Sequence, residues 1–318
     1  MRLVVMIPAY NEEESIGDVI KGIILVRDKV LNALFENVSI LVINDGSEDN
    51  SVRVAEEARA DKIISHKRNE GLGPTFATAI EKALLMGADI IVNIDADGQF
   101  DSWDIPRLVK PIIDEEADMV TCTRFAEKTP DMPWLKKFGN RRFTNIVNQL
   151  AGGNFTDTQC GFRAYSREAA LRLTLFGRYT YTQEVFLDLA RKGMEIIEIP
   201  CKVKGEREGE SRLIKNVFSY GFKALLIILR SYRDFQPLRF FGGFGLGMFI
   251  PGVVIALILA IRLLLFNRIS PYMSLVYISL VLIIVGVLML VLALVAEMYV
   301  RQRELQEEIL YKLKKSEK

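Results

Sequence analysis

The chain has 318 residues, a hydrophobic fraction of 50% and a formal net charge of +1 at neutral pH. Its length fits one large domain with an additional segment, and its nearly neutral charge excludes a strongly basic nucleic-acid-binding protein, so no nucleic-acid partner is expected. The single histidine, His66, excludes a histidine-rich metal site.

The first hundred residues alternate between patterns typical of strands and of helices. Short apolar runs predict strands at residues 3–8, 38–43, 62–65 and 89–94. Apolar residues at helical spacing predict helices at residues 12–34, 48–60 and 72–88. Strands that alternate with helices form βαβ units, which predicts an α/β, Rossmann-like fold with a mostly parallel sheet. In such sheets, ligands bind outside the carboxyl ends of the strands.

The pattern is less regular between residues 101 and 200. A helix is expected at residues 104–117, where Asp104 can cap it and Pro106 suits its first turn. Further strands are expected at residues 118–124, 160–166 and 194–200. Further helices are expected at residues 135–152, 167–177 and 182–193. This region should complete a domain that extends from residue 1 to residue 210.

The composition changes after residue 210 and predicts membrane attachment. Residues 211–239 are amphipathic and basic, as is typical of interfacial helices. Residues 240–266 and 272–300 are long and apolar enough to cross a bilayer as a hairpin, and a polar tail follows at 301–318. Basic residues flank the hairpin on the side of both termini, which places both termini and the α/β domain in the cytosol by the positive-inside rule. The small residues at 242–247 permit copies of the chain to assemble without requiring it.

The three cysteines predict neither a metal site nor a disulfide. Cys122, Cys160 and Cys201 are far apart, odd in number and without the spacing of metal ligands. We therefore expect reduced thiols, as in cytosolic proteins.

Carboxylates gather where a predicted strand ends. Asp95 and Asp97 directly follow the strand at 89–94, and Gln99 adds another polar side chain. Mg²⁺ and Mn²⁺ prefer oxygen ligands, and Mg²⁺ is commonly held by one or two carboxylates together with phosphate oxygens. The alternative is that these acids only cap the following helix. Glu12 and Asp45 are expected at the same edge of the sheet and favour the metal site, although Asp45 also fits an ordinary Asp-Gly turn.

The motifs together resemble those of a known enzyme family. The segments "IPAYNEEESI", "VINDGSEDNS", "NEGLGP" and "NIDADGQF" occur in the order and spacing of glycosyltransferase family 2, whose members have the GT-A fold. The later segments "GNRRFTN", "DTQCGFRAYSREAAL", "YTQEVFLDLARKG" and "EGESRL", with the hairpin, are similar to polyprenyl-phosphate hexose transferases. These include dolichyl-phosphate mannose synthases and bacterial prenyl-phosphate glucosyltransferases.

The resemblance implies a role for individual residues. The nucleotide would be held by Pro8, Tyr10, Glu12, Asp45 and Asp95. The metal, Mg²⁺ or Mn²⁺, and the donor diphosphate would be bound by Asp95, Asp97 and Gln99. The acceptor phosphate would be bound by Arg124, Arg141, Asn145 and Arg207, where Asn145 replaces a serine common in relatives. Asp97, Asp95 and Arg124 would form the catalytic centre.

The sequence therefore predicts a membrane-bound, metal-dependent and inverting transferase. It would move a hexose from a nucleotide sugar of the GDP-mannose or UDP-glucose type to a polyprenyl phosphate such as dolichyl or undecaprenyl phosphate. A phosphate nucleophile is already ionised, so it needs no strong general base. Two alternatives stay open: a glycosyltransferase with another lipid or polysaccharide acceptor, and an inactive membrane subunit that binds nucleotide sugar.

Overall fold

The computed structural model describes residues 1–124, 144–145, 147–149, 152–174, 181–201, 203, 233, 236–268 and 270–316. The contacts between residues divide the chain into two units. The first unit comprises Met1–Glu210 together with Tyr311–Lys318, and the second comprises Ser211–Leu310.

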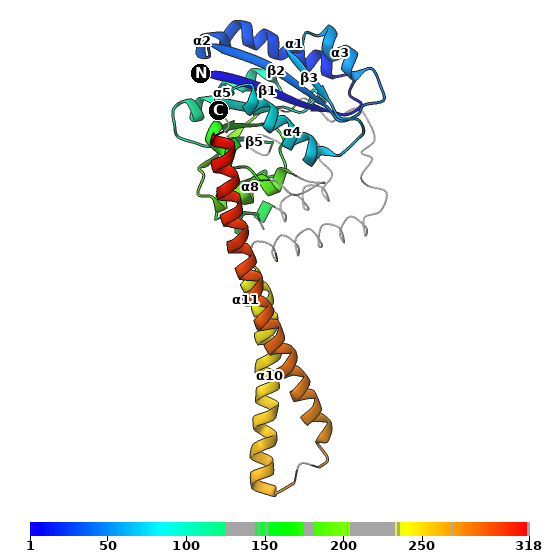
Figure 1. The fold of residues 1–318 in the computed structure, drawn as a ribbon, viewed down its shortest axis with the longest axis vertical. Helices are drawn as coiled ribbons and strands as arrows, with labels where there is room; N and C mark the ends of the chain where they lie inside the picture. The colour runs from blue at the N-terminus through cyan, green and yellow to red at the C-terminus, as the bar shows by residue number, and fades with distance from the viewer. Residues whose placement is uncertain are drawn as a thin grey trace. The chain divides into compact units, whose positions relative to one another are not determined.

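The first unit is built around a seven-stranded sheet (Figure 1). Its strands are β1 (Arg2–Ala9), β2 (Asn37–Asn44), β3 (Lys62–Ser65), β4 (Ile90–Asn93), β5 (Met119–Thr123), β6 (Arg163–Ser166) and β7 (Ile196–Pro200). They lie in the order β3-β2-β1-β4-β6-β5-β7. Only β6 is antiparallel to its neighbours, β4 and β5, whereas the other pairs are parallel. The prediction of a mostly parallel α/β sheet is confirmed.

Helices connect the strands in this unit. They are α1 (Ile16–Val26), α2 (Asn32–Leu34), α3 (Ser51–Glu57), α4 (Leu72–Leu85), α5 (Ile105–Ile113), α7 (Arg167–Arg172) and α8 (Thr182–Arg191). A π-helical turn, η1 (Arg27–Leu31), joins α1 to α2, and a 3-10 turn, η2 (Ser102–Asp104), precedes α5. Of the helix expected at 135–152, residues 144–145 and 147–149 are helical and the others, except Gly152, lie outside the described residues.

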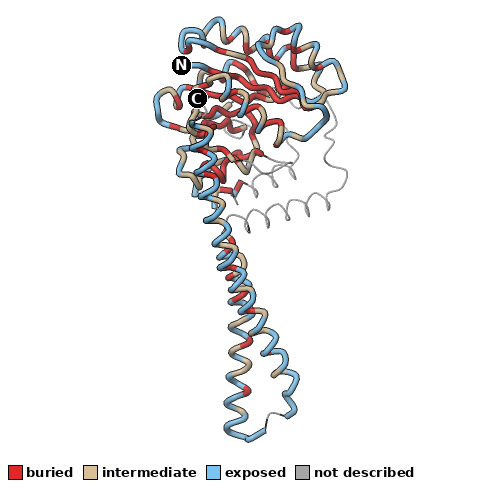
Figure 2. The backbone as a smooth tube through the Cα atoms, in the orientation of Figure 1, coloured by how far each residue is buried: buried red, intermediate tan, exposed pale blue. Residues whose placement is uncertain are grey.

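Alternate residues of the central strands face opposite sides of the sheet. Leu3, Val5 and Ile7 of β1 are buried in one core with apolar residues of α1, α3 and α5. On the other side of the sheet, α4 contacts β1 and β2 and buries Phe76 and Ala83. Figure 2 shows the strands as the most deeply buried part of this unit. Two-sided burial explains why these strands are continuous apolar runs in the sequence.

The second unit contains two long apolar helices, α10 (Pro237–Phe266) and α11 (Met273–Ser316), each long and apolar enough to span a membrane. Glycines allow them to approach closely. A Cβ atom on Gly286 would lie 2.7 Å from the backbone nitrogen of Phe249. α11 also continues through the expected polar tail to Ser316. Its residues from Tyr311 onward belong to the first unit. Of the interfacial helices expected at 211–239, residues 211–232 and 234–235 lie outside the described residues.

The expectation of three reduced thiols is wrong for two of them. Cys122 and Cys201 form a disulfide across 79 residues, and Cys160 is free and buried. The two residues are distant in sequence but close in space because β5 and β7 are paired in parallel. The backbone N–H of Cys201 donates to the carbonyl oxygen of Thr123, one residue after Cys122. Spacing along the chain could not reveal a pair that depends on strand order.

Candidate active site

The candidate site lies at the carboxyl ends of the central strands. β1 pairs in parallel with both β2 and β4, so the residues that follow these three strands come to one edge of the sheet. Tyr10 follows β1, Asp45 follows β2 and Asp95 comes soon after β4. Polar segments from three separate parts of the sequence are thereby brought together.

Asp45 is buried and organises the loop that follows β3. One carboxylate oxygen accepts hydrogen bonds from the Glu70 backbone N–H at 2.9 Å and contacts His66 Nδ1 at 3.0 Å. The other oxygen accepts from the Gly71 N–H at 2.9 Å. The turn after Asp45 needs glycine, because Gly46 has a φ of +70° and a Cβ there would lie 2.5 Å from the Arg68 backbone. Asp45 therefore fixes the loop after β3, and Gly46 permits the turn.

The segment after β1 supplies the other expected nucleotide contacts. Pro8 is buried within β1, whereas Tyr10 is 37% exposed. Glu12 is half-buried. Its backbone N–H donates to Ser51 Oγ at 2.8 Å, and its carboxylate accepts from Ser15 Oγ at 3.2 Å. Tyr10 thus offers an accessible aromatic face, and Glu12 a carboxylate, near the carboxyl end of β1.

The backbone of a distant segment lies against Asp95, which is half-buried. A Cβ atom on Gly161 would lie 2.6 Å and 2.8 Å from the two Asp95 carboxylate oxygens. Asn93, fully buried at the end of β4, donates from Nδ2 to the Gly161 carbonyl oxygen at 2.7 Å and to the Tyr181 hydroxyl at 3.2 Å. The hydrogen bond from Asn93 therefore holds the Gly161 backbone against Asp95.

The charges around Asp95 do not balance. The pKa of Asp95 is raised to about 6, chiefly by burial and also by the negative charges of Asp97 and Glu12, whereas Arg163 and Arg124 oppose the shift. These four charged groups are therefore close enough to influence Asp95. A positive ligand next to Asp95 would stabilise its ionised form.

The neighbouring acidic residues make different hydrogen bonds. Asp101, which the capping alternative did not include, caps η2 by accepting from the Trp103 N–H at 3.1 Å. Asp97 accepts from the Gln99 N–H at 3.1 Å, and both side chains are half-buried. Within the described part of the chain, Asp95 has no such capping bond. Capping therefore explains Asp101 but not Asp95.

The residues fit a hard divalent cation. Among the described residues, no three His, Cys, Asp or Glu side chains form a ligand cluster. Two carboxylates are nevertheless enough for Mg²⁺, which usually keeps water and binds phosphate oxygens as well. Burial and the neighbouring carboxylates disfavour the ionised form of Asp95, and such a cation would favour it. Asp95 and Asp97 would hold it, with Gln99 next to them.

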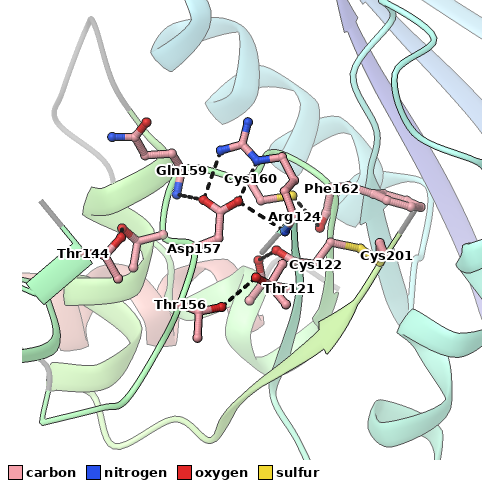
Figure 3. Close-up of polar contacts among 12 residues, drawn as sticks. Thr121, Cys122, Arg124, Thr144, Thr156, Asp157, Gln159, Cys160, Phe162 and Cys201 are labelled. Atoms are coloured by element: carbon pink, nitrogen blue, oxygen red, sulfur yellow. Dashed lines mark hydrogen bonds and ion pairs between the residues drawn. A yellow bond between two sulfur atoms is a disulfide. The ribbon is translucent and has the colours of Figure 1, made fainter. Parts of the chain in front are cut away.

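Arg124 follows β5 and is paired with a buried carboxylate (Figure 3). Its Nε donates to Asp157 Oδ2 at 2.6 Å, and its Nη2 donates to Asp157 Oδ1 at 3.0 Å. The Asp157 side chain has no exposed surface, whereas 22% of the Arg124 side chain is exposed. Burial by itself would lower the pKa of Arg124, but the hydrogen bonds and charge of Asp157 outweigh it and raise the pKa above its usual value.

The other expected acceptor contacts are only partly described. Asn145 is exposed on a helical segment, whereas Arg141 and Arg207 lie outside the described residues. The sequence reasoning assigned no role to Asn93, Asp157, Gly161 or Arg163. The last three belong to the quoted motif "DTQCGFRAYSREAAL", so the signal was visible, but their partners in the fold were not.

Comparisons with known proteins agree with the family that the sequence motifs resemble. The model of the family described as "Glycosyl transferase family 2" matches residues 4–174. A UDP-N-acetylglucosamine–dolichyl-phosphate N-acetylglucosaminyltransferase from Methanococcus voltae is 32% identical over 62% of this chain and 83% of that protein. A dolichyl-phosphate hexose transferase from Haloferax volcanii is 28% identical over 66% of this chain and 86% of that protein.

Solved structures support the same fold. Glucosyl-3-phosphoglycerate synthase from Mycobacterium tuberculosis, in complex with Mn²⁺, UDP and glucosyl-3-phosphoglycerate, matches with a TM-score of 0.54. The match covers 73% of this chain and 78% of that chain at 20% identity, which shows the fold alone. The family match covers more than half of the chain and includes β1 to β6 with the acidic segment after β4. The chain therefore belongs to glycosyl transferase family 2, has the GT-A fold and is a glycosyltransferase.

Proposed function

We propose that the chain transfers a hexose from a nucleotide diphosphate sugar to a polyprenyl phosphate at a membrane surface. The observation that carries the proposal is the gathering of Asp95, Asp97 and Arg124 at one edge of the sheet, close enough for their charges to act on Asp95. The acid pair suits a cation with a diphosphate, and the arginine suits a second phosphate. Relatives whose names specify dolichyl phosphate support the lipid acceptor.

The donor is bound at the ends of β1, β2 and β4. Tyr10, Glu12 and the loop fixed by Asp45 hold the nucleoside, with Pro8 shaping the start of the segment. Asp95, Asp97 and Gln99 hold Mg²⁺ or Mn²⁺ at the diphosphate. When bound, this cation neutralises the charge that develops on the departing nucleoside diphosphate.

The acceptor reacts as an anion. One oxygen of the lipid phosphate attacks the anomeric carbon while the bond from that carbon to the diphosphate oxygen breaks, which inverts the anomeric centre. Arg124, with Arg141, Asn145 and Arg207, holds the acceptor phosphate, because an arginine fork matches phosphate oxygens. No protein base has to remove a proton, so orientation and charge stabilisation provide most of the acceleration.

The two apolar helices would anchor the enzyme where its lipid acceptor resides. α10 and α11 are each long and apolar enough to cross a bilayer. Arg230, Arg233 and Arg239 precede the hairpin, and Arg301 and Arg303 follow its apolar part. The positive-inside rule then places both termini and the catalytic unit in the cytosol.

The test is a transfer assay with the purified full-length chain in detergent. UDP-glucose, UDP-N-acetylglucosamine and GDP-mannose are offered with dolichyl phosphate, in Mn²⁺, in Mg²⁺ or in EDTA. We expect one donor to give a sugar-linked lipid, only with metal. Asp97→Asn should abolish this transfer, whereas Asp101→Asn, which can still cap η2, should retain it. Metal-independent transfer, or equal rates for both variants, would contradict the assigned roles.

A further inference from the structure

Asp157 occupies only one side of the Arg124 guanidinium. An arginine has five N–H donors, and the pair with Asp157 uses one on Nε and one on Nη2. Three donors, two of them on Nη1, remain for a second anion. In Figure 3, one guanidinium nitrogen points away from the Asp157 carboxylate. The buried carboxylate can therefore fix the orientation of Arg124 while Arg124 binds a phosphate.

Asp157 is itself held rigidly by the neighbouring strand β7. Glu198 accepts from the Asp157 backbone N–H at 2.8 Å through Oε1. Its Oε2 accepts from the backbone N–H and the hydroxyl of Thr156, each at 2.8 Å. Asp157 Oδ1 also accepts from the Gln159 N–H at 3.1 Å. These bonds fix the backbone and the carboxylate together.

The same loop holds the segment that carries Asn145. Asn148 and Phe155 exchange two hydrogen bonds, from Asn148 Nδ2 to the Phe155 carbonyl at 2.8 Å and from the Phe155 N–H to Asn148 Oδ1 at 2.9 Å. The hydroxyls of Thr144 and Thr158 are 3.2 Å apart. Residues 155–158 thus connect two of the expected acceptor residues, Arg124 and Asn145, that are far apart in sequence.

We propose that Asp157 is a positioning residue for the acceptor phosphate. It orients Arg124 directly and, through the loop at residues 155–158, fixes the segment of Asn145. This inference rests on the proposed function, because it assumes that Arg124 receives the phosphate of a polyprenyl phosphate. It requires Asp157 to influence acceptor binding and to leave donor binding nearly unchanged.

The experiment uses a double-mutant cycle in the full-length chain. Asp157→Asn, Arg124→Gln and the double variant are compared by their KM for dolichyl phosphate, their KM for the donor and their melting temperature. Asp157→Asn should raise the KM for dolichyl phosphate by about tenfold or more, because it replaces one acceptor oxygen with an amide donor. The donor KM should stay within about twofold. In the Arg124→Gln background, Asp157→Asn should cause little further increase in the KM for dolichyl phosphate.

Asp188→Asn is the matched control. Asp188 is also buried and paired, since one of its oxygens lies 2.8 Å from Lys192 Nζ, but it is on α8 and outside the proposed site. This variant should lower the melting temperature without changing the KM for dolichyl phosphate. Comparison of this variant with Asp157→Asn separates the effect of losing a buried ion pair from the effect of losing the orientation of Arg124.

Several results would overturn the inference. One such result is that Asp157→Asn lowers only the melting temperature, as the control does. Another is that its effect on the KM for dolichyl phosphate multiplies fully with the effect of Arg124→Gln. If Asp157→Asn does not fold, Glu198→Gln disturbs the same loop more gently, and an unchanged acceptor KM in that variant rejects the inference. Transfer by the wild type with unchanged KM in the variants removes the inference alone. Absence of transfer to dolichyl phosphate by the wild type removes the proposed function and the inference together.

Discussion

A Cβ atom on Gly161 would lie 2.6 Å and 2.8 Å from the carboxylate oxygens of Asp95. Such a contact cannot persist, and Asn93 holds the Gly161 carbonyl in place, so the carboxylate has to move. Gly161→Ala should therefore weaken Mn²⁺ binding by about tenfold or more, the range seen when residues that orient metal ligands are changed. Free Mn²⁺ can be titrated by electron paramagnetic resonance, without turnover.

The control for this variant is Gly247→Ala on α10. A Cβ atom on Gly247 meets nothing within 4 Å, so the same substitution should leave Mn²⁺ affinity unchanged. Equal Mn²⁺ affinity in Gly161→Ala and the wild type would show that Asp95 does not need its present position to bind metal.

Asp45 serves three hydrogen-bonding partners with two oxygens, and asparagine cannot. In Asp45→Asn, the new amide group would face an N–H of Glu70 or Gly71 or the His66 ring. The free energy of unfolding should fall by about 1–3 kcal/mol, the cost of leaving a buried polar group unsatisfied. Because the loop at the donor site loosens, the KM for the nucleotide sugar should rise while the KM for the polyprenyl phosphate stays constant. A rise in the acceptor KM alone would contradict this assignment.

At the scale of elements, the disulfide joins Cys122 of β5, two residues before Arg124, to Cys201, the residue that follows β7. Cys122 and Cys201 are separated by 79 residues, so the crosslink constrains a long stretch of the unfolded chain. Reduction should lower the free energy of unfolding by about 2–4 kcal/mol. Melting curves with and without reductant measure this, and Cys201→Ser should be insensitive to reductant. Identical curves for the wild type in both conditions would contradict a structural role of the disulfide.

The end of α11 packs on α7 within the first unit. The Tyr311 hydroxyl donates to Glu168 at 3.0 Å, the Arg172 guanidinium lies 4.3 Å from the Tyr311 ring centroid, and Lys314 donates to the Leu173 carbonyl at 3.2 Å. Tyr311→Ala should lower the melting temperature by about 2–4 °C or more, and Tyr311→Phe by less, because it keeps the ring. Equal losses in both variants would assign the effect to the hydroxyl alone.

This contact also has a predictable pH dependence. Burial by itself would raise the pKa of Glu168, but hydrogen bonds from Arg172 and Tyr311 outweigh it and lower the pKa below its usual value. Ionised Glu168 therefore stabilises the folded state above its unfolded pKa, and this contribution is lost as the pH falls through the lowered pKa. The difference in melting temperature between wild type and Glu168→Gln should shrink in acid.

Elements with strong periodicity could be predicted from the sequence, whereas contacts between distant elements could not. The strand at Lys62–Ser65 and the start of α4 at Leu72 agree with the apolar pattern. Asp95 and Asp97 were found because they follow a strand directly. The Asp157–Arg124 pair, the Gly161–Asp95 contact and the Cys122–Cys201 disulfide each join segments more than 30 residues apart. They depend on β6 and β7 flanking β5, and this strand order has no local signal.

At the scale of the whole molecule, one chain combines a GT-A sheet with two apolar helices. The first unit alone has the parts that a soluble glycosyltransferase needs, namely a sheet edge suited to a nucleotide and the carboxylates of Asp95 and Asp97. The apolar helices and Arg124 acquire a common explanation only when the acceptor is both a lipid and a phosphate. The proposed function therefore depends on a lipid phosphate as the acceptor.

A direct test of this acceptor compares dolichyl phosphate with dolichol. The purified chain, with Mn²⁺ and its preferred nucleotide sugar, is given either lipid or diacylglycerol, and the lipid products are identified by mass spectrometry. We expect a sugar-phosphate-lipid from dolichyl phosphate, release of nucleoside diphosphate in equal amount, and no product from dolichol or diacylglycerol. Glycosylated dolichol or diacylglycerol, with dolichyl phosphate left unchanged, would contradict the proposed function.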